Sequence, residues 1–354
     1  MNDKLIITLP VAPYSPLSVG KMTTPILGES LAKTMNAKFV MSLNLLSTYQ
    51  KRDSEGFYNL MKNYNINPDY YWCDSEHINE LIEKVYSLIK MGYIKEKEKK
   101  IILCDCGKVE IDSDNIETIN MDDTLIEIVN GKYYCKSCKK ECHTIVKKAL
   151  VFDSRMVDKS NLVFYPEFMN KERVTFDDTV GSHDVIISRK RDTGIVIEIN
   201  NNQYNIDIDF IWEIFLSLFN ESEKIVMCGN RQLFQLYMVG MLEKCFNRES
   251  KTVCLATPYL EKSDKQILLE NRKLSLKVFT LLSLKWAKKS NTFDETLLKY
   301  INSMNVQKKQ MLYDILIEEI QSSGNLEVDL KKVLTKKYNL QNANSELKRR
   351  RKNG

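Results

Sequence analysis

Five of the nine cysteines in this 354-residue chain lie close together in the sequence. Cys104 and Cys106 form one closely spaced pair, Cys135 and Cys138 form another, and Cys142 follows shortly after. A tight turn can direct both thiolates of such a pair toward one metal ion, and four thiolates complete the tetrahedral coordination that Zn²⁺ prefers. The spacing therefore predicts a structural zinc site with the first four of these cysteines as ligands.

Two alternatives to this ligand set remain open in the sequence. Cys142 and His143 are further candidate ligands, and all five thiols could instead be surface thiols without metal. The other four cysteines stand alone in mostly apolar surroundings, as is typical of buried, reduced thiols. They are Cys73, Cys228, Cys245 and Cys254. This cysteine usage predicts a cytoplasmic protein.

A second group of residues that could do chemistry lies in the segment Leu17-Ser18-Val19-Gly20-Lys21. A glycine at a helix start lets a phosphate approach the backbone, and the amides at a helix N-terminus attract anions. Lys21 would add a positive charge and Ser18 a hydrogen-bond donor. The alternative is that Lys21 is a solvated residue in the first turn of a helix.

The elements that must position this loop follow an α/β pattern. Residues 4–11 are a short apolar run ended by prolines, which predicts a buried strand. A helix is expected from about Thr24, and residues 37–46 predict a second strand. Strand, helix and strand make a right-handed βαβ unit, the first half of a mononucleotide-binding fold.

The rest of the chain extends this pattern. Residues 55–98 are polar and helical, and residues 151–225 mix short strands with loops. Residues 223–245 predict a strand, a glycine turn and a helix, and residues 251–260 predict one more strand. From about Glu270 to Leu340 the pattern is helical. We therefore expect a Rossmann-like α/β protein with an inserted zinc knuckle and a helical C-terminal region.

Five segments follow from this organisation. They are the first half of the nucleotide-binding domain (1–98), the zinc-knuckle insertion (99–150), the second half of the nucleotide-binding domain (151–269), the helical region (270–340) and a basic tail (341–354).

Several stretches together resemble a class I aminoacyl-tRNA synthetase of the methionyl, isoleucyl, leucyl and valyl branch, nearest to the methionyl enzymes. The stretches are the first βαβ unit, the cysteine insert, IISRKRDTG (186–194), FIW (210–212), VMCGNRQLFQLYMVGML (226–242), LSLKVFTLLS (274–283) and NTFDETLLKYINS (291–303). The likeness spans residues 4–305, but no motif of the family is intact. It implies that Trp212 lies on a strand, and we expect this side chain to pack in the core.

The resemblance implies a reaction that joins a carboxylate to the α-phosphate of ATP and releases pyrophosphate. Ser18 and Lys21 stand where the family has its two phosphate-binding histidines, and Gly20 would admit the nucleotide. Lys262 and Lys265 in EKSDK stand for the family's lysine loop, which neutralises the leaving pyrophosphate.

An alternative lysine loop is KLSLK at 273–277. However, the position of this segment in the chain matches the helix that follows the lysine loop better than the loop itself. Lys277 then stands where the family has an arginine.

The same resemblance implies a changed substrate. Gly229 and Asn230 form the turn that meets the nucleotide, but Arg231 replaces the aspartate that would bind the ribose hydroxyls. Tyr14 is similar to the tyrosine that shapes the family's amino-acid pocket. Asn44 ends the second strand, where methionyl-type enzymes hold the substrate ammonium with a carboxylate.

Three functions remain open. The first is a repurposed, ATP-dependent adenylating ligase that transfers an amino acid or another carboxylate to a small acceptor. The second is a non-catalytic paralogue that binds a protein, an RNA or a metabolite, and the third is a divergent aminoacyl-tRNA synthetase. The helical region from Glu270 to Leu340 has only about 70 residues, too few for the complete anticodon-binding domain of the family.

The end of the chain and its overall composition bear on partners. LKRRRK at 347–352 could contact RNA phosphates, or it could be a disordered, solubilising terminus, which we favour. The net charge of +5 is modest, and no apolar run approaches the roughly 18–20 residues that span a bilayer. We therefore expect no membrane partner.

Overall fold

The computed structural model of the chain describes most of its residues. These are residues 4–15, 17–47, 52–113, 125–157, 162–172, 174, 176–177, 184–189, 194–219, 223–229, 232–248, 251–261, 273–286 and 290–353. No helix within these ranges is both long and apolar enough to cross a membrane.

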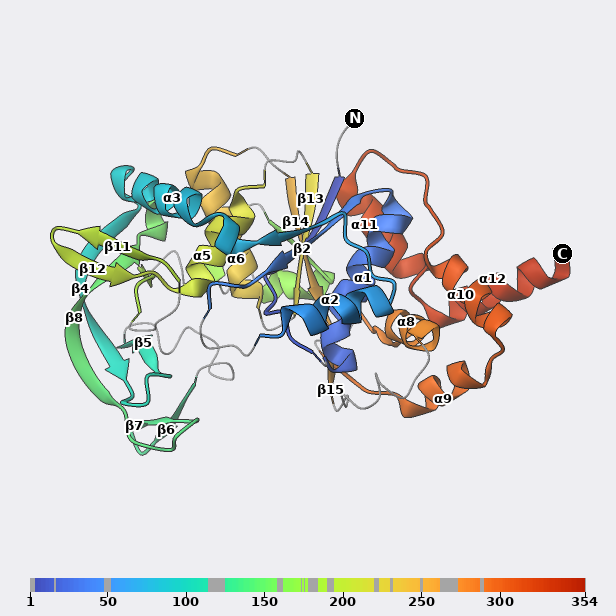
Figure 1. Ribbon diagram of the computed structural model, residues 1–354, viewed down its shortest axis with the longest axis horizontal. Helices are drawn as coiled ribbons and strands as arrows, with labels where there is room; N and C mark the ends of the chain where they lie inside the picture. The colour runs from blue at the N-terminus through green and yellow to red at the C-terminus, as the bar shows by residue number, and fades with distance from the viewer. Residues whose placement is uncertain are drawn as a thin grey trace.

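A six-stranded parallel sheet forms the centre of the elongated molecule (Figure 1). The strand order is β3-β2-β1-β13-β14-β9. The strands are β1 (Lys4–Thr8), β2 (Lys38–Leu43), β3 (Tyr70–Cys73), β9 (Val163–Tyr165), β13 (Glu223–Gly229) and β14 (Lys251–Thr257). The central strands are apolar and buried on both faces because a parallel sheet is covered on each side. The expected βαβ unit is confirmed, since β1 pairs with β2 in parallel.

Two hydrophobic cores lie on opposite faces of this sheet. Side chains of β2 alternate between them, with Phe39, Met41 and Leu43 in the first core and Val40 in the second. The helices that contribute to the first core are α1 (Val19–Met35), α2 (Ser54–Asn63), α8 (Lys273–Ser283), α9 (Glu295–Ser303), α10 (Val306–Leu316), α11 (Leu326–Lys336) and α12 (Leu340–Asn353). The helices of the second core are α3 (Ile78–Lys90), α5 (Ile208–Ser217) and α6 (Leu233–Cys245).

A long β-ribbon extends from the second face and carries the cysteine cluster (Figure 1). In this ribbon β4 (Ile94–Leu103) pairs antiparallel with β8 (His143–Phe152) along its whole length. The smaller strands are β5 (Glu110–Asp112), β6 (Ile126–Val129), β7 (Lys132–Cys135), β10 (Val185–Ile186), β11 (Val196–Ile199), β12 (Asn202–Asn205), β15 (Tyr259–Glu261) and β16 (Ser290–Thr292). The 3-10 turns are η1 (Asp74–Glu76), η3 (Ser154–Met156) and η4 (Glu167–Met169). The domain boundaries drawn from the sequence stay predictions.

Four local expectations were wrong, and the first two concern the start of helix α1 and the edge strand β3. Helix α1 begins at Val19 rather than near Thr24, because Val19 and Met22 are fully buried and the Ser18 carbonyl already accepts the amides of Lys21 and Met22. Residues 70–73, expected to be helical, form the edge strand β3.

Trp212 lies on helix α5 rather than on a strand. The Asp207 side chain caps this helix by accepting the amide of Asp209. The indole of Trp212 is buried, as expected for core packing.

The C-terminal residues form helix α12, so the expectation of a disordered tail was wrong. Ala343 and Leu347 lie four residues apart on this helix and are buried in the first core. The Arg350 guanidinium bonds Glu318 at 2.7 Å and Glu346 at 2.9 Å. Apolar burial and these ion pairs hold the end of the chain on α10 and the segment that follows it.

Asp329 ties α11 to the start of the central strand. Its carboxylate is 1% exposed and accepts bonds from Ser322 Oγ, the Ser323 amide and Lys4 Nζ at 2.8, 2.9 and 3.0 Å. Burial opposes ionisation, but these bonds outweigh it and lower the pKa of Asp329 to about 2.

We expect Asp329→Asn to lower the free energy of unfolding at pH 7 by about 2 kcal/mol. Because the folded state depresses the pKa, this stabilisation is complete above about pH 4 and is lost as the pH falls toward 2. Urea unfolding at pH 7 and pH 3 should therefore show a smaller difference from wild type at pH 3. Asp314→Asn, at an exposed position, is the control, and a difference that ignores pH would contradict this account.

Candidate functional site

The carboxyl ends of β1 and β13 mark the point where the strand order reverses. From β1 the chain builds outward to β2 and β3, whereas β13 and β14 lie on the other side of β1. In open parallel sheets such a point forms a crevice that binds ligands. Helix α1 follows β1, and Thr24 Oγ1 lies 3.1 Å from Thr257 Oγ1 at the end of β14. The N-terminal turns of α1 therefore lie at this edge of the sheet.

Ser18, Gly20 and Lys21 lie together at the start of α1. Ser18 is the half-buried N-cap residue, and its side chain makes no capping hydrogen bond. Gly20 is half-buried and Lys21 is exposed. The Lys21 ammonium contacts the Tyr14 hydroxyl and lies 4.7 Å from the centre of the Tyr14 ring. The structure thus brings Tyr14 and Lys21 into direct contact beside the crevice.

Asn44 follows the end of β2 and is fully buried. Its backbone amide bonds the Val11 carbonyl at 2.9 Å, which joins the loop after β1 to the loop after β2. Its side-chain Oδ1 accepts the Ser47 amide at 3.0 Å. The structure therefore places Asn44 near the loop that contains Tyr14.

Asp74 is a buried carboxylate that the sequence analysis did not identify. It follows the end of β3, and its Oδ1 accepts the amides of Leu45 and Leu46 at 2.7 and 3.1 Å. Burial raises the pKa of Asp74, although these bonds and the nearby indole N–H of Trp212 act in the opposite direction. The Trp212 N–H lies beside this carboxylate without a hydrogen bond of normal geometry. No local motif points to Asp74, because its partners lie 28 and 29 residues away in the sequence.

Of the other residues predicted to bind the nucleotide or pyrophosphate, only Gly229 is among the described residues. Gly229 ends β13 at the crevice and is half-buried, with its amide 3.2 Å from Gln232 Oε1. Asn230, Arg231, Lys262 and Lys265 lie outside the described residues. Their assignments stay predictions.

Lys277 belongs to helix α8 and is not part of a lysine loop. Its ammonium is buried and bonds Glu29 Oε2 at 2.7 Å and the Asn65 carbonyl at 3.1 Å. Burial lowers the pKa of Lys277, whereas the ion pair with Glu29 opposes this change. The segment 273–277 thus joins α8 to α1, as its place before a helix suggested.

Ser188, Arg189 and Gly194 each make a structural contact with a neighbouring segment. Ser188 Oγ accepts the Leu150 amide at 2.8 Å, and Arg189 pairs with the carboxylate of Asp207. Gly194 has a φ of +96°, and a Cβ atom at this position would collide with the Ile206 carbonyl oxygen. This motif joins the base of the ribbon to the N-terminus of α5.

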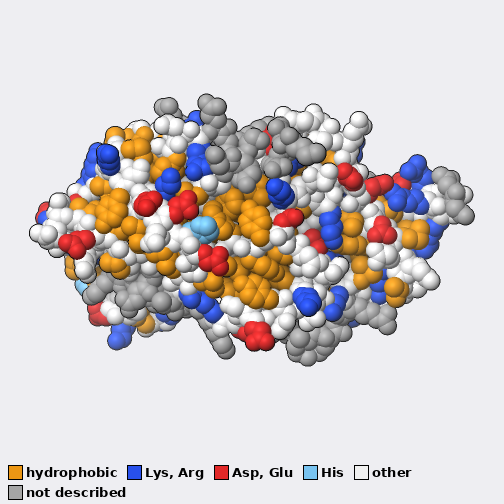
Figure 2. Space-filling model, turned by 45° about the horizontal axis from the view of Figure 1, so that its top comes forward, with side chains coloured by type: hydrophobic (Ala, Val, Ile, Leu, Met, Phe, Trp, Pro, Cys, Tyr) orange, Lys and Arg blue, Asp and Glu red, His pale blue; other side chains and the backbone are white. Residues whose placement is uncertain are grey.

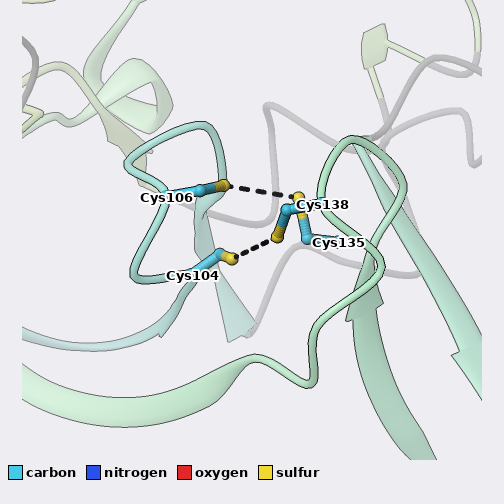
Figure 3. A group of neighbouring side chains, drawn as sticks. All are labelled: Cys104, Cys106, Cys135 and Cys138. Carbon is cyan, nitrogen blue, oxygen red and sulfur yellow. Dashed lines mark hydrogen bonds between the residues drawn. The ribbon is translucent and has the colours of Figure 1, made fainter.

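The four predicted zinc ligands converge between two loops of the ribbon (Figure 3). The sulfur atoms of Cys104, Cys106, Cys135 and Cys138 all lie within 4.8 Å of one another. Cys104 Sγ lies 3.4 Å from Cys138 Sγ, and Cys106 Sγ lies 3.6 Å from Cys135 Sγ. Tetrahedral zinc with Zn–S bonds of about 2.3 Å separates its sulfurs by about 3.8 Å. The four thiols therefore fit a tetrahedral metal ion such as zinc.

The turns around the thiols favour metal binding. Gly107 has a φ of +73° and its amide bonds the Cys104 carbonyl, and Lys139 has a φ of +59° with its amide on the Cys135 carbonyl. Burial opposes ionisation of Cys135, but the amides of Cys138 and Ser137 outweigh it and lower its pKa to about 7. Such a thiol ionises readily, as a metal ligand must.

The two spare candidates lie outside this group. Cys142 is buried beside Cys104 but is not one of the four converging thiols. His143 Nδ1 lies 3.5 Å from Asp105 Oδ1. The four isolated cysteines are buried and reduced, as expected.

The parallel sheet, the inserted thiol knuckle and the helices after the sheet together match the fold of solved methionyl-tRNA synthetases. Solved structures of methionyl-tRNA synthetase from Mycobacterium tuberculosis are similar to this chain. One complex of that enzyme with methionyl-adenylate matches at a TM-score of 0.66 and 12% identity, over 88% of this chain and 72% of that chain. A second complex with methionyl-adenylate gives 0.65 at 12% identity, over 89% and 72%. The free form gives 0.64 at 13% identity, over 89% and 70%.

No protein-family model matches this sequence, and no curated protein is significantly similar to it in sequence. The likeness to methionyl-tRNA synthetase is therefore one of fold. It confirms the resemblance and the fold class that the sequence indicated.

Proposed function

We propose that this chain is an ATP-dependent, adenylate-forming ligase that activates a carboxylate and transfers the acyl group to a small acceptor. The observation that carries this proposal is the position of Gly20 in the first turn of α1, at the crevice between β1 and β13. The similar solved structures include synthetases bound by methionyl-adenylate, the product of such an activation. An amino acid or another small carboxylic acid is the proposed substrate.

In the proposed reaction a carboxylate oxygen attacks the α-phosphorus of ATP, and the bond to pyrophosphate breaks. The amides at the start of α1, the Ser18 hydroxyl and the Lys21 ammonium would stabilise the phosphate charge that develops. Lys262 and Lys265 would neutralise the pyrophosphate, and Gly229 and Asn230 would hold the nucleoside. Tyr14 and Asn44 would contact the acyl substrate.

A second candidate function is a non-catalytic binding module. One observation favours it: the Lys21 ammonium contacts Tyr14, so a phosphate must compete with the phenol for this lysine.

Charging of tRNA is the third candidate. Figure 2 shows basic side chains gathered toward the C-terminal end, but Arg349 and Arg350 of α12 pair with Glu346. These pairs reduce the charge that is available to RNA.

We also propose that the four converging cysteines hold zinc as a structural ion. Four thiolates leave no open coordination position for a substrate or a water molecule. The ion would fix the two loops of the knuckle, whose own hydrophobic cluster is small.

Exchange of pyrophosphate into ATP, measured over a panel of amino acids and other carboxylic acids, tests the ligase proposal. We expect at least one acid to support exchange, and Lys21→Ala to slow it by about 10- to 100-fold, because it removes a charge-assisted phosphate contact. Lys33→Ala, in the last turn of the same helix, is the matched control. If no acid supports exchange and calorimetry detects no ATP binding, the ligase proposal fails and the binding module replaces it.

A further inference from the structure

The knuckle contains one thiol more than a tetrahedral zinc ion binds. Four thiolates complete the coordination of zinc, and the four converging cysteines supply them. The fifth thiol is that of Cys142, which is 9% exposed and belongs to the small hydrophobic cluster of the knuckle. Buried cysteines commonly serve as small apolar packing residues. The position of Cys142 indicates a further role.

Cys142 lies on the same face of the ribbon as the zinc ligand Cys104. Leu103 and His143 are the last register partners of β4 and β8, so Cys104 and Cys142 are the next residues across the ribbon. Opposite residues of an antiparallel pair point to the same face, with Cβ atoms about 4.5–5.5 Å apart. The thiols of Cys142 and Cys104 are accordingly in hydrogen-bond contact. A thiol outside the ligand set therefore borders the metal site.

The four ligands differ in their exposure to solvent. Cys106 is exposed and Cys138 is half-buried, whereas Cys104 and Cys135 are buried. A metal keeps its thiol ligands ionised, and an ionised thiol reacts with oxidants and other electrophiles that can reach it. Cys106 is therefore the ligand that is most open to chemical modification.

We infer that Cys142 is a replacement ligand, which takes the place of Cys106 on the zinc ion when Cys106 is modified. The sulfur of Cys142 is not among those that all lie within 4.8 Å of one another, so the exchange requires its side chain to move. A change of rotamer provides such a movement. Cys142 releases its proton to solvent as it binds, so one thiolate replaces another and the charge of the site is kept. This inference rests on the proposed zinc site.

Alkylation of the full chain with iodoacetamide tests the exchange directly. The Cys106 sulfur attacks the methylene carbon of the reagent, a carbon–sulfur bond forms, and iodide leaves. We expect mass spectrometry to find Cys106 modified first, while one zinc ion per chain remains bound. The same modification of the variant Cys142→Ser should release zinc to a chromogenic chelator at least about tenfold faster, because no thiol replaces the lost ligand.

A second test replaces the modification by a substitution and counts the ligands. Cys106→Ser should keep one zinc ion per chain, whereas Cys106→Ser combined with Cys142→Ser should bind zinc at least about 100-fold more weakly. Cobalt in place of zinc absorbs near-ultraviolet light in proportion to the number of thiolates that it binds. We expect the cobalt form of Cys106→Ser to retain the absorbance of four thiolates, and that of the double variant to fall to three.

The matched control combines Cys106→Ser with Cys73→Ser. Cys73 is also a buried thiol, at 6% exposure, but it lies on β3, so this double variant should bind zinc as Cys106→Ser does. Equal loss of zinc from Cys106→Ser with and without Cys142→Ser, zinc kept equally by both, or first alkylation of another cysteine would each overturn the inference and leave the zinc site in place. A wild-type chain that binds no zinc would refute the site and the inference together.

Discussion

Replacing both Cys135 and Cys138 by serine should reduce the zinc content of the purified protein from one ion per chain to none. Binding energies of structural zinc sites are about 10–16 kcal/mol, and the hydrophobic cluster beside the knuckle is too small to replace that amount. The loops that carry the four thiols should therefore unfold locally. We expect limited proteolysis to cut within residues 104–142 while the parallel sheet remains intact.

Cys142→Ser is the matched control for this experiment. Cys142 is buried beside Cys104 but lies outside the four converging thiols, so its replacement should leave one zinc ion per chain. Metal analysis of the three proteins, expressed and purified together, gives the comparison. Zinc retained by the double variant, or lost equally by the control, would refute this ligand set.

Lys277→Ala should cause a large loss of stability. The Lys277 ammonium is buried against Glu29, which is itself 2% exposed. The substitution therefore leaves a buried carboxylate whose negative charge is balanced much less by neighbouring positive charge. Removing one partner of such a pair typically costs about 3–5 kcal/mol. The midpoint of urea unfolding at pH 7 measures the effect.

The chain offers an internal control on the same carboxylate. Lys33 also pairs with Glu29, at 3.2 Å, but its side chain is 43% exposed. Since exposed pairs contribute about 1 kcal/mol or less, Lys33→Ala should shift the midpoint only slightly. Replacing Glu29 by Gln together with Lys277 by Met should recover most of the loss, because no buried charge remains. Equal effects of the two lysine substitutions would contradict this interpretation.

The parts of the fold that the sequence predicted well depend on local signals. The strand at 4–8 and the thiol pairs are recognisable because apolar runs and close cysteine spacing lie within a few residues. Edge strand β3 was missed because it is short and Tyr70 is 43% exposed, so it lacks the apolar character of a central strand. Helix α5 was mistaken for a strand because the resemblance placed Trp212 on a strand, and because nearly all residues of the helix are buried, so they form one short apolar run.

The candidate site was harder to predict than the fold because its contacts are not local. The sequence pointed to Asn44 by resemblance, but it gave no sign that Asp74 would lie beside it, since the two meet only when β2 and β3 pair. Lysines are frequent in this chain, so their spacing alone could not show that Lys277 is buried against Glu29. The buried pair Ala343 and Leu347, four residues apart, was the signal that would have predicted α12.

The position of β1 between β2 and β13 has a consequence for how the protein is made. One edge of β1 pairs with β2 soon after synthesis, but the other edge pairs with residues 223–227, which leave the ribosome about two hundred residues later. At synthesis rates of about 5–20 residues per second, that edge stays open for roughly 10–40 s. An apolar strand left unpaired for so long is a site for aggregation. The nascent chain should therefore depend on chaperones until the second half of the sheet emerges.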